Sequence, residues 1–192
     1  MSKLIILDRD GVINEDSDHY IRSAEDWHPI PGSIEAIAQL SKANYQIAVA
    51  TNQSGLARGY FQHEDLEAMH QKLTQLVEQQ GGKLAGIYFC PHGPDDHCDC
   101  RKPKPGMIIQ ILKDLQQPAE TTWVVGDSLR DLQAGLQAGC KTALVKTGKG
   151  QRTLDTGALK PSEPDSSHEL NNSPVFSNLK AFTAALLKEG SE

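Results

Sequence analysis

The sequence predicts an α/β fold with a doubly wound, Rossmann-like parallel sheet in the strand order 3-2-1-4-5. Short apolar runs with strand character alternate along the chain with segments whose apolar residues recur at helical spacing. The first two runs end in polar residues, Asp8 and Thr51, where such sheets place their sites. We expect all 192 residues to form a single domain, 1–192.

Five runs are predicted to be buried parallel strands. They are short and apolar, as expected for strands that are covered on both faces. They span residues 3–7, 46–51, 86–90, 122–126 and 141–146. Because the crossovers between parallel strands are right-handed, the carboxyl ends of these strands share one edge of the sheet.

The segments between these strands are predicted to be helices. Each has an apolar stripe at helical spacing, and Gly or Pro marks one of its ends. The helices are expected at residues 33–43, 63–80, about 108–115 and 129–138. Residues 147–173 are polar and rich in Ser, Pro, Gly and Asp, so we expect a surface segment there. A last extended piece at 174–176 and a docking helix at about 178–188 follow.

The composition excludes several classes of protein. A net charge of -6 argues against a nucleic-acid surface, because such a surface needs basic residues to neutralise phosphates. No apolar run is long enough for a signal-peptide core or a membrane span. We therefore expect a cytoplasmic monomer that binds a small molecule, with neither nucleic acid nor membrane as a partner.

Three carboxylates are predicted to meet at the sheet edge. Asp8 and Asp10 directly follow the first strand, and Asp127 follows the fourth. In the order 3-2-1-4-5 these strands are neighbours, so the carboxylates converge and need a cation between them; hard oxygen ligands suit Mg²⁺. Alternatively, Asp8-Arg9-Asp10-Gly11 is an ordinary turn and Asp127 an N-cap.

Two further residues could bind an anion at the same edge. Thr51 ends the second strand and leads into Asn52-Gln53-Ser54-Gly55, which offers a hydroxyl and backbone amides. Lys102 lies before the third helix and could neutralise phosphate oxygens. A capped turn and a solvated surface lysine are the alternatives for these two residues.

A zinc loop is predicted in front of Lys102. Cys90, His92, Cys98 and Cys100 give four soft ligands within eleven residues, which suits a closed, structural Cys₃His zinc site. His97 could replace His92. Disulfides are the other alternative, although they would leave one thiol of the three unpaired.

Taken together, Asp8, Asp10, Thr51, Lys102 and Asp127 resemble, in order and spacing, the four motifs of the haloacid dehalogenase (HAD) superfamily of phosphatases. The resemblance covers about residues 3–146 and implies the HAD fold. It implies that Asp8 is the nucleophile that attacks phosphorus, and that Asp10 protonates the leaving oxygen and later activates water. Asp8, Asp127 and the carbonyl of Asp10 would hold Mg²⁺, and Thr51 and Lys102 would orient and neutralise the phosphoryl group.

Residues 51–59, 90–100 and 101–107 resemble more specifically the heptose-bisphosphate phosphatases, a branch of this superfamily that serves ADP-heptose and lipopolysaccharide synthesis. The spaces between the motifs are too short for a cap domain, so an open site is expected. The resemblance implies substrate contacts from Arg101 and from two short segments, made up of Asp16, Ser17, Asp18 and His19 and of Thr51, Asn52, Gln53 and Ser54. From its charge and position, Arg58 is expected to help bind the distal phosphate.

Two other functions stay open at this point. The short gap between His92 and Cys98 resembles the related histidinol-phosphate phosphatases as much as the heptose enzymes, and Ser128 follows the metal aspartate where some heptose enzymes have a lysine. A zinc-stabilised protein that binds a phosphorylated ligand without turnover is an alternative of another class, but such a protein would have no need of the Asp8 and Asp10 pair.

Overall fold

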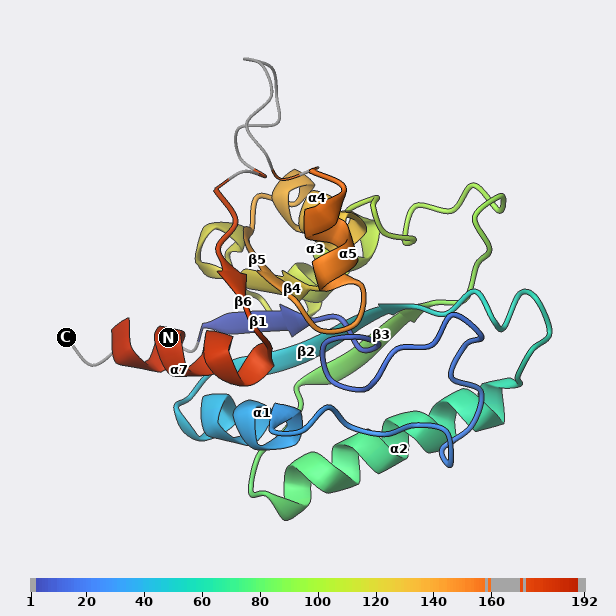
Figure 1. Ribbon diagram of the computed structural model, residues 1–192, viewed down its shortest axis with the longest axis horizontal. Helices are drawn as coiled ribbons and strands as arrows, with labels where there is room; N and C mark the ends of the chain where they lie inside the picture. The colour runs from blue at the N-terminus through green and yellow to red at the C-terminus, as the bar shows by residue number, and fades with distance from the viewer. Residues whose placement is uncertain (1–2, 158, 160–169, 171, 190–192) are drawn as a thin grey trace.

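The protein is built around one parallel sheet. The computed structural model describes residues 3–157, 159, 170 and 172–189. In this part of the chain six strands lie in the order β3-β2-β1-β4-β5-β6, all parallel (Figure 1). The predicted order 3-2-1-4-5 is confirmed, and β6 (Val175–Phe176) adds an edge strand beside β5.

The elements agree with the predicted ones to within a residue or two. The strands are β1 (Leu4–Leu7), β2 (Gln46–Asn52), β3 (Gly86–Cys90), β4 (Trp123–Gly126) and β5 (Lys141–Val145). The helices are α1 (Ser33–Lys42), α2 (His63–Gln79), α3 (Gly106–Asp114), α4 (Leu129–Gln137), α5 (Gly150–Asp155) and α7 (Leu179–Glu189), with a short 3-10 turn, η1 (Ala119–Thr121).

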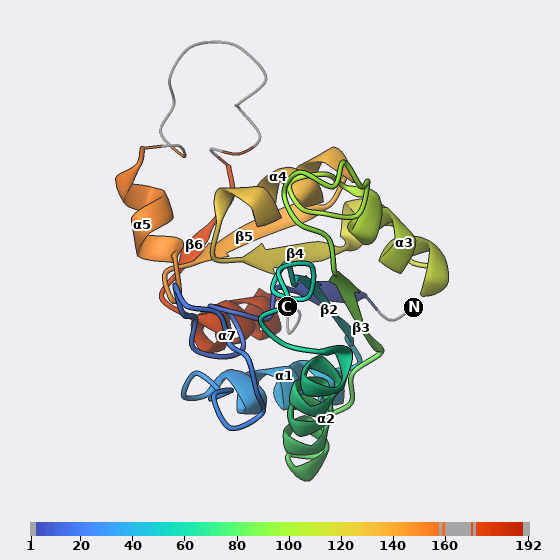
Figure 2. The same cartoon turned by 90° about the vertical axis from the view of Figure 1, so that its right-hand side faces the viewer.

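Helices cover both faces of the sheet. Figures 1 and 2 show α1, α2 and α7 on one face and α3 and α4 on the other. The central strand β1 is fully buried, with Ile5 and Leu7 in the first hydrophobic cluster and Leu4 and Ile6 in the second. This alternation follows from the two-residue period of a strand, and it explains why the run is apolar at every position.

Local signals in the sequence set the limits of α2. Gln62 and Asp65 form a capping box at its start, and the chain leaves its end through Gly81, at φ 75°. Between these points Leu66, Met69 and the residues that continue their stripe are buried against the sheet. The apolar stripe therefore fixes which face of α2 turns inward against the sheet.

The predicted polar segment is partly helical. Within residues 147–173, α5 (Gly150–Asp155) packs beside β5. Its Thr153 is buried, and the hydroxyl of Thr153 donates to the carbonyl of Asp127 at 3.0 Å. Residues 158, 160–169 and 171 of this segment lie outside the described residues. Among the described helices, none is long and apolar enough to cross a membrane.

The helix α7 joins the hydrophobic core beneath β4 and β5. Its Phe182 is 1% exposed and packs edge-on against Trp123 and Phe176, with ring centroids 5.7 and 5.5 Å apart. Such aromatic contacts bury a large area in a fixed geometry. The packing supports the prediction that the C-terminal helix unfolds together with the rest of the domain.

We expect Phe182→Ala to lower the free energy of unfolding by about 3–4 kcal/mol, since it removes a fully buried ring. Urea denaturation monitored by far-ultraviolet circular dichroism would give one cooperative transition at a lower midpoint. Lys188→Ala, an exposed change on the same helix, is the control and should stay within about 0.5 kcal/mol of the parent. A separate early transition for α7 would contradict the single-domain prediction.

Candidate active site

Three carboxylates meet at the carboxyl ends of β1 and β4. Asp8 follows β1, Asp127 follows β4, and Asp131 lies in the first turn of α4. One carboxylate oxygen from each lies within 4.8 Å of the other two. The strand order brings the groups together, since β1 and β4 are hydrogen-bonded neighbours and the amide of Asp8 donates to the carbonyl of Val125.

The charges in this cluster are out of balance in the protein alone. Burial, with the negative charge of Asp131, raises the pKa of Asp8 to about 7. Burial, with the charges of Asp131 and Asp8, raises the pKa of Asp127 to about 8. Carboxylates that resist ionisation this strongly are poised for a cation, and an all-oxygen donor set matches the preference of Mg²⁺.

A glycine allows the loop after β1 to approach Asp127. Gly11 has φ 86°, and a β-carbon there would lie 2.0 Å from Oδ2 of Asp127. Only glycine meets both demands, the left-handed backbone and the missing side chain. The Asp-x-Asp-Gly string is therefore a turn, as the simpler interpretation has it, and this turn carries two aspartates to the edge of the site.

Lys102 is buried among the carboxylates. Its side chain is 3% exposed, and Nζ lies 2.9 Å from Oδ1 of Asp8 and 2.7 Å from Oδ1 of Asp131. Nζ also donates to the carbonyl of Ala50 at 2.7 Å. Although burial alone would lower the pKa of Lys102, the charges of Asp131 and Asp8 outweigh it and raise the pKa. The lysine thus stays charged inside the site.

The end of β2 holds the Lys102 backbone in place. The Asn52 side chain accepts a hydrogen bond from the amide of Lys102 at 3.1 Å and donates to its carbonyl at 3.0 Å. Both polar atoms of Asn52 are thereby used. The neighbouring Thr51 is 1% exposed, and its hydroxyl accepts from Nε2 of Gln53 at 2.8 Å.

The carboxylate of Asp10 has its own set of hydrogen-bond donors. Oδ1 accepts from Nδ2 of Asn14 at 2.9 Å, Oδ2 accepts from Nε2 of Gln53 at 2.9 Å, and the Arg9 guanidinium bonds both oxygens. Burial raises the pKa of Asp10, but Arg9 and these hydrogen bonds outweigh burial and hold the pKa below its usual value. Its side chain thus differs in character from those of Asp8 and Asp127, whose pKa values are raised.

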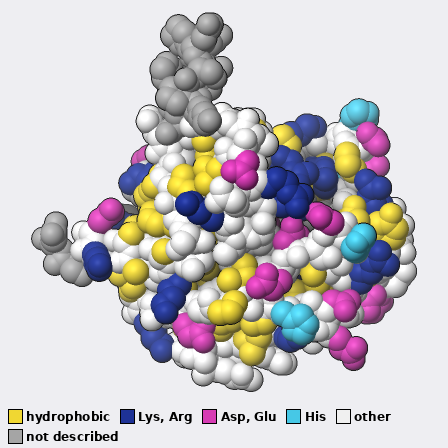
Figure 3. Space-filling view, viewed as in Figure 1, with side chains coloured by type: hydrophobic (Ala, Val, Ile, Leu, Met, Phe, Trp, Pro, Cys, Tyr) yellow, Lys and Arg dark blue, Asp and Glu magenta, His cyan; other side chains and the backbone are white. Residues whose placement is uncertain are grey.

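These residues line a pocket of about 230 Å³ at the carboxyl edge of the sheet. Over this edge, at the right of the molecule, Figure 3 shows Lys and Arg side chains gathered next to acidic ones. The polar and charged lining residues are Asp8, Asp10, Asp16, Ser17, Asp18, Tyr20, Thr51, Asn52, Gln53, Ser54, Arg101, Lys102, Asp127, Ser128, Arg130, Asp131 and Lys149. The pocket therefore suits a small, highly polar and anionic molecule.

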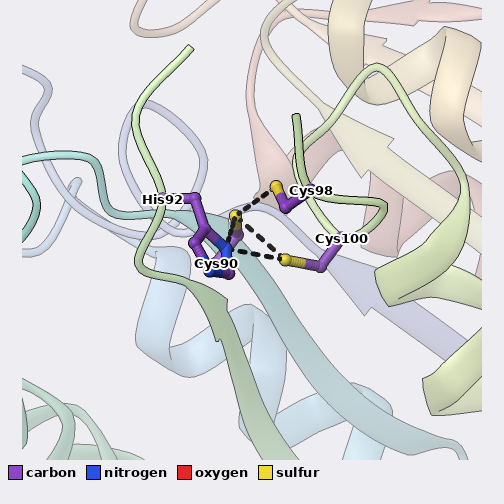
Figure 4. Close-up of side chains that lie close together, drawn as sticks. All are labelled: Cys90, His92, Cys98 and Cys100. Atoms are coloured by element: carbon purple, nitrogen blue, oxygen red, sulfur yellow. Dashed lines mark hydrogen bonds between the residues drawn. The ribbon is translucent and has the colours of Figure 1, made fainter. Parts of the chain in front are cut away.

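The four predicted zinc ligands come together beside this pocket. Sγ of Cys90 lies 3.7 Å from Sγ of Cys98, 3.1 Å from Sγ of Cys100 and 3.5 Å from Nδ1 of His92 (Figure 4). Tetrahedral zinc bound to sulfur and nitrogen would place its ligand atoms about 3.5–3.8 Å apart. The cluster fits a zinc site, and all four cysteines of the chain are free rather than paired in disulfides.

The Cys90–Cys100 loop also positions a cation of the pocket. The guanidinium of Arg101 donates from Nη1 to the carbonyl of His92 at 3.3 Å. Farther along, Nζ of Lys104 donates to the carbonyl of Cys98 at 2.6 Å. The loop that carries the cysteines is thus tied to the segment that carries Lys102.

Comparison with known proteins places the chain in a family. A HAD-hydrolase-like family model matches residues 99–168. A D-glycero-beta-D-manno-heptose-1,7-bisphosphate 7-phosphatase of Pseudomonas aeruginosa is 53% identical over 96% of this chain and 98% of its own, and one of Neisseria meningitidis is 50% identical over 97% and 96%. The crystal structure of the D,D-heptose 1,7-bisphosphate phosphatase of B. bronchiseptica, complexed with magnesium and phosphate, superposes with a TM-score of 0.89 at 46% identity, covering 97% of this chain and 99% of that one.

The chain belongs to the D-glycero-beta-D-manno-heptose-1,7-bisphosphate 7-phosphatase family. The HAD fold and the resemblance to the heptose-bisphosphate branch are thereby confirmed. In this family member the site is open, because among the described residues short segments, and no cap domain, stand between the motifs.

Three charged residues that line the pocket were not predicted. Asp131 lies four residues after Asp127 and joins the carboxylate cluster, but it also closes a capping box with Ser128, which explains its presence without any metal. Arg130 and Lys149 also line the pocket. Lys149 follows β5 at the same sheet edge, and its amide donates to Oδ2 of Asp127 at 2.7 Å while Nζ pairs with Asp16 at 2.9 Å.

Two predicted substrate contacts lie outside the pocket. Arg58 and His19 are exposed and are absent from the pocket lining, whereas their neighbours Ser54 and Asp18 contribute to it. The amide of Arg58 donates to the carbonyl of Ser54 in a tight turn. The contact from Arg58 was expected from its charge and position and that from His19 from the resemblance, and both stay predictions.

Proposed function

We propose that the protein hydrolyses the 7-phosphate of D-glycero-β-D-manno-heptose 1,7-bisphosphate and releases heptose 1-phosphate and inorganic phosphate. The observation that carries the proposal is Asp8, a carboxylate at the end of β1 that lies against Lys102 and faces a pocket rich in cations. The names of relatives 50–61% identical to the chain supply the substrate.

The reaction proceeds in two steps on the residues at the sheet edge. A carboxylate oxygen of Asp8 attacks phosphorus, the bond from phosphorus to the sugar oxygen breaks, and Asp10 gives a proton to that oxygen. Because the pKa of Asp10 is lowered in the protein alone, Asp10 would have to take up this proton when the substrate binds. Water then attacks the aspartyl phosphate while Asp10 takes the water proton, which regenerates Asp8 and releases phosphate. Lys102 and Thr51 hold the phosphoryl oxygens during both steps.

We assign Asp8, Asp127 and the carbonyl of Asp10 as ligands of Mg²⁺, with Asp131 as a further candidate. The bound ion would neutralise the carboxylates and the phosphate oxygens so that the two anions can meet. The related B. bronchiseptica structure, with its magnesium and phosphate, supports this assignment.

The distal phosphate would be bound by the cations at the pocket rim. Arg101, Arg130 and Lys149 all line the pocket, outside the Asp8 and Lys102 contact. The hydroxyl groups of the sugar would bond Asp16, Ser17 and Asp18. In this assignment Arg130 supplies a positive charge two residues after Ser128, the position at which some heptose enzymes have a lysine.

The rim disfavours the histidinol-phosphate alternative. Histidinol phosphate has an ammonium group where the bisphosphate has its second phosphate, and three cations would repel it. A binding protein without turnover is disfavoured by the paired Asp8 and Asp10, because a site that only binds a phosphorylated ligand has no need of a nucleophile and an acid. A cytoplasmic monomer stays a prediction of the sequence.

We also propose that Cys90, His92, Cys98 and Cys100 bind one structural zinc ion. With four protein ligands the ion would have no open position for water, so its task would be to fix the loop. Through the Arg101 bond to the His92 carbonyl, a fixed loop would set where a rim cation stands.

Asp8→Asn should lower the rate of phosphate release at least about 10³-fold, because the amide is a poor nucleophile. Release of inorganic phosphate with Mg²⁺ present would measure the effect, and circular dichroism would verify the fold. Asp114→Asn, an exposed aspartate on α3, is the matched control and should keep full activity. Hydrolysis within tenfold of the parent in Asp8→Asn would contradict the mechanism.

The substrate assignment predicts that kcat/KM for β-heptose 1,7-bisphosphate exceeds that for histidinol phosphate at least about 100-fold, since two rim cations forming charged hydrogen bonds contribute about 3 kcal/mol. Phosphorus-31 NMR of the product should show the 1-phosphate retained. Equal or faster turnover of histidinol phosphate would refute the assignment while leaving the two-step mechanism intact.

Zinc removal should raise KM more than it lowers kcat. We expect the purified protein to contain about one zinc per chain, and Cys100→Ser to lose it and to raise KM about tenfold, because Arg101 loses its anchor. Metal analysis and steady-state kinetics would measure both. Cys140→Ala, which changes the cysteine outside the cluster, should keep the metal and KM. Full zinc content or an unchanged KM in Cys100→Ser would contradict this role.

A further inference from the structure

A fully buried arginine stands between the two catalytic aspartates. Arg9 has an exposed fraction of 0%, and its guanidinium grips the Asp10 carboxylate from one side. Nε lies 3.1 Å from Oδ1, and Nη2 lies 3.0 Å from Oδ1 and 3.1 Å from Oδ2. A buried guanidinium is stable only when its donors are paired, so the partner of the third nitrogen matters.

That partner is His70 on α2, 61 positions away along the chain. Nη1 of Arg9 lies 3.4 Å from Nε2 of His70. Burial and the charge of Arg9 lower the pKa of His70 to about 4, so the ring is neutral near pH 7 and Nε2 can accept the hydrogen bond. The ring also packs against Phe89 of β3, with centroids 5.9 Å apart, which limits its rotation.

His70 reaches Asp10 from outside the catalytic pocket. It lines a separate shallow hollow on α2, together with Glu67, Gln71, Thr74 and Gln75. The chain of contacts runs from this hollow through Arg9 to Asp10, and none of the residues in the hollow lines the pocket. A substitution at position 70 can therefore disturb Asp10 while every group that lines the pocket is retained.

We propose that His70 is a positioning residue that, through Arg9, holds the Asp10 carboxylate at the leaving oxygen of the substrate. The inference rests on the proposed function, because it assigns Asp10 the transfer of a proton to that oxygen. An acid or base contributes its full effect only when it stands within hydrogen-bond reach of its target. Without His70, Nη1 of Arg9 loses its acceptor, and the guanidinium is free to turn from Asp10 toward solvent at the hollow.

The test compares two leaving groups. A sugar oxygen departs as a strongly basic alkoxide and needs a proton from Asp10, whereas p-nitrophenolate departs without one. Since kcat/KM reports the steps up to the departure of the leaving group, a misplaced Asp10 lowers kcat/KM for the sugar phosphate selectively. Damage to the whole site would lower both values together. The ratio of the two values is also independent of the fraction of folded protein in a sample.

We expect His70→Leu to lower kcat/KM for heptose 1,7-bisphosphate about 10- to 100-fold, and to reduce the ratio of this value to that for p-nitrophenyl phosphate at least tenfold. His70→Gln, whose amide oxygen can accept the Arg9 hydrogen bond near the place of Nε2, should restore the ratio to within about threefold. An unchanged ratio in His70→Leu, or a ratio that His70→Gln does not restore, would overturn the proposal.

The chain offers a matched control in His63. This residue lies on the same helix and against the same Phe89 ring, at 6.2 Å, but it is exposed, and among the described residues Arg9 is bonded by His70 and not by His63. His63→Leu should leave the ratio unchanged, and a reduced ratio would overturn the proposal. If the parent does not hydrolyse heptose bisphosphate, the proposed substrate is wrong. The role of His70 can then still be tested with mannose 6-phosphate in place of heptose bisphosphate, because its leaving group is also a sugar alkoxide.

Discussion

The site depends on a buried ion pair network centred on Lys102. One ammonium group bonds Asp8 from β1, Asp131 from α4 and the carbonyl of Ala50 in β2. Removing one partner of such a buried pair costs about 3–5 kcal/mol, because the remaining charge loses its compensation. The lysine therefore joins three elements of the fold at the point proposed for the phosphoryl group, and its charge stabilises the carboxylates that it bonds.

Hydrogen bonds from two other segments fix the backbone around Lys102. Asn52 holds the lysine backbone at the end of β2, and the carbonyl of His92 holds Arg101 beside it. The loop that carries the cysteine cluster is thus bonded directly to Arg101, a cation that lines the pocket. Loops are usually the most mobile parts of an α/β protein. The Cys90–Cys100 loop has few apolar residues that could pack against the core, and a bound metal would hold it in place.

The sequence predicted best those features that follow directly from the secondary structure. Apolar runs predicted the sheet, and strand ends predicted Asp8, Thr51 and Asp127, because a parallel sheet places those ends together. Asp131 was not predicted to belong to the site, because an aspartate that caps a helix and one that could bind a metal look the same in the sequence. The contact of His70 with Arg9 was not predicted, because the two residues are 61 positions apart and local spacing indicates no such contact. For His19 and Arg58, only coordinates show which side of a turn faces the pocket.

Charge balance explains why one small edge of the sheet can bind both a metal and an anion. The carboxylates of Asp8, Asp127 and Asp131 oppose a single Lys102, which leaves two negative charges when all three are ionised. The raised pKa values of Asp8 and Asp127, about 7 and 8, show that without a cation protons compete for these oxygens near neutral pH. A divalent ion would match the deficit and displace those protons, so its affinity must rise with pH through that range. The edge would then be neutral, and the surrounding cations could attract a phosphate that the carboxylates alone would repel.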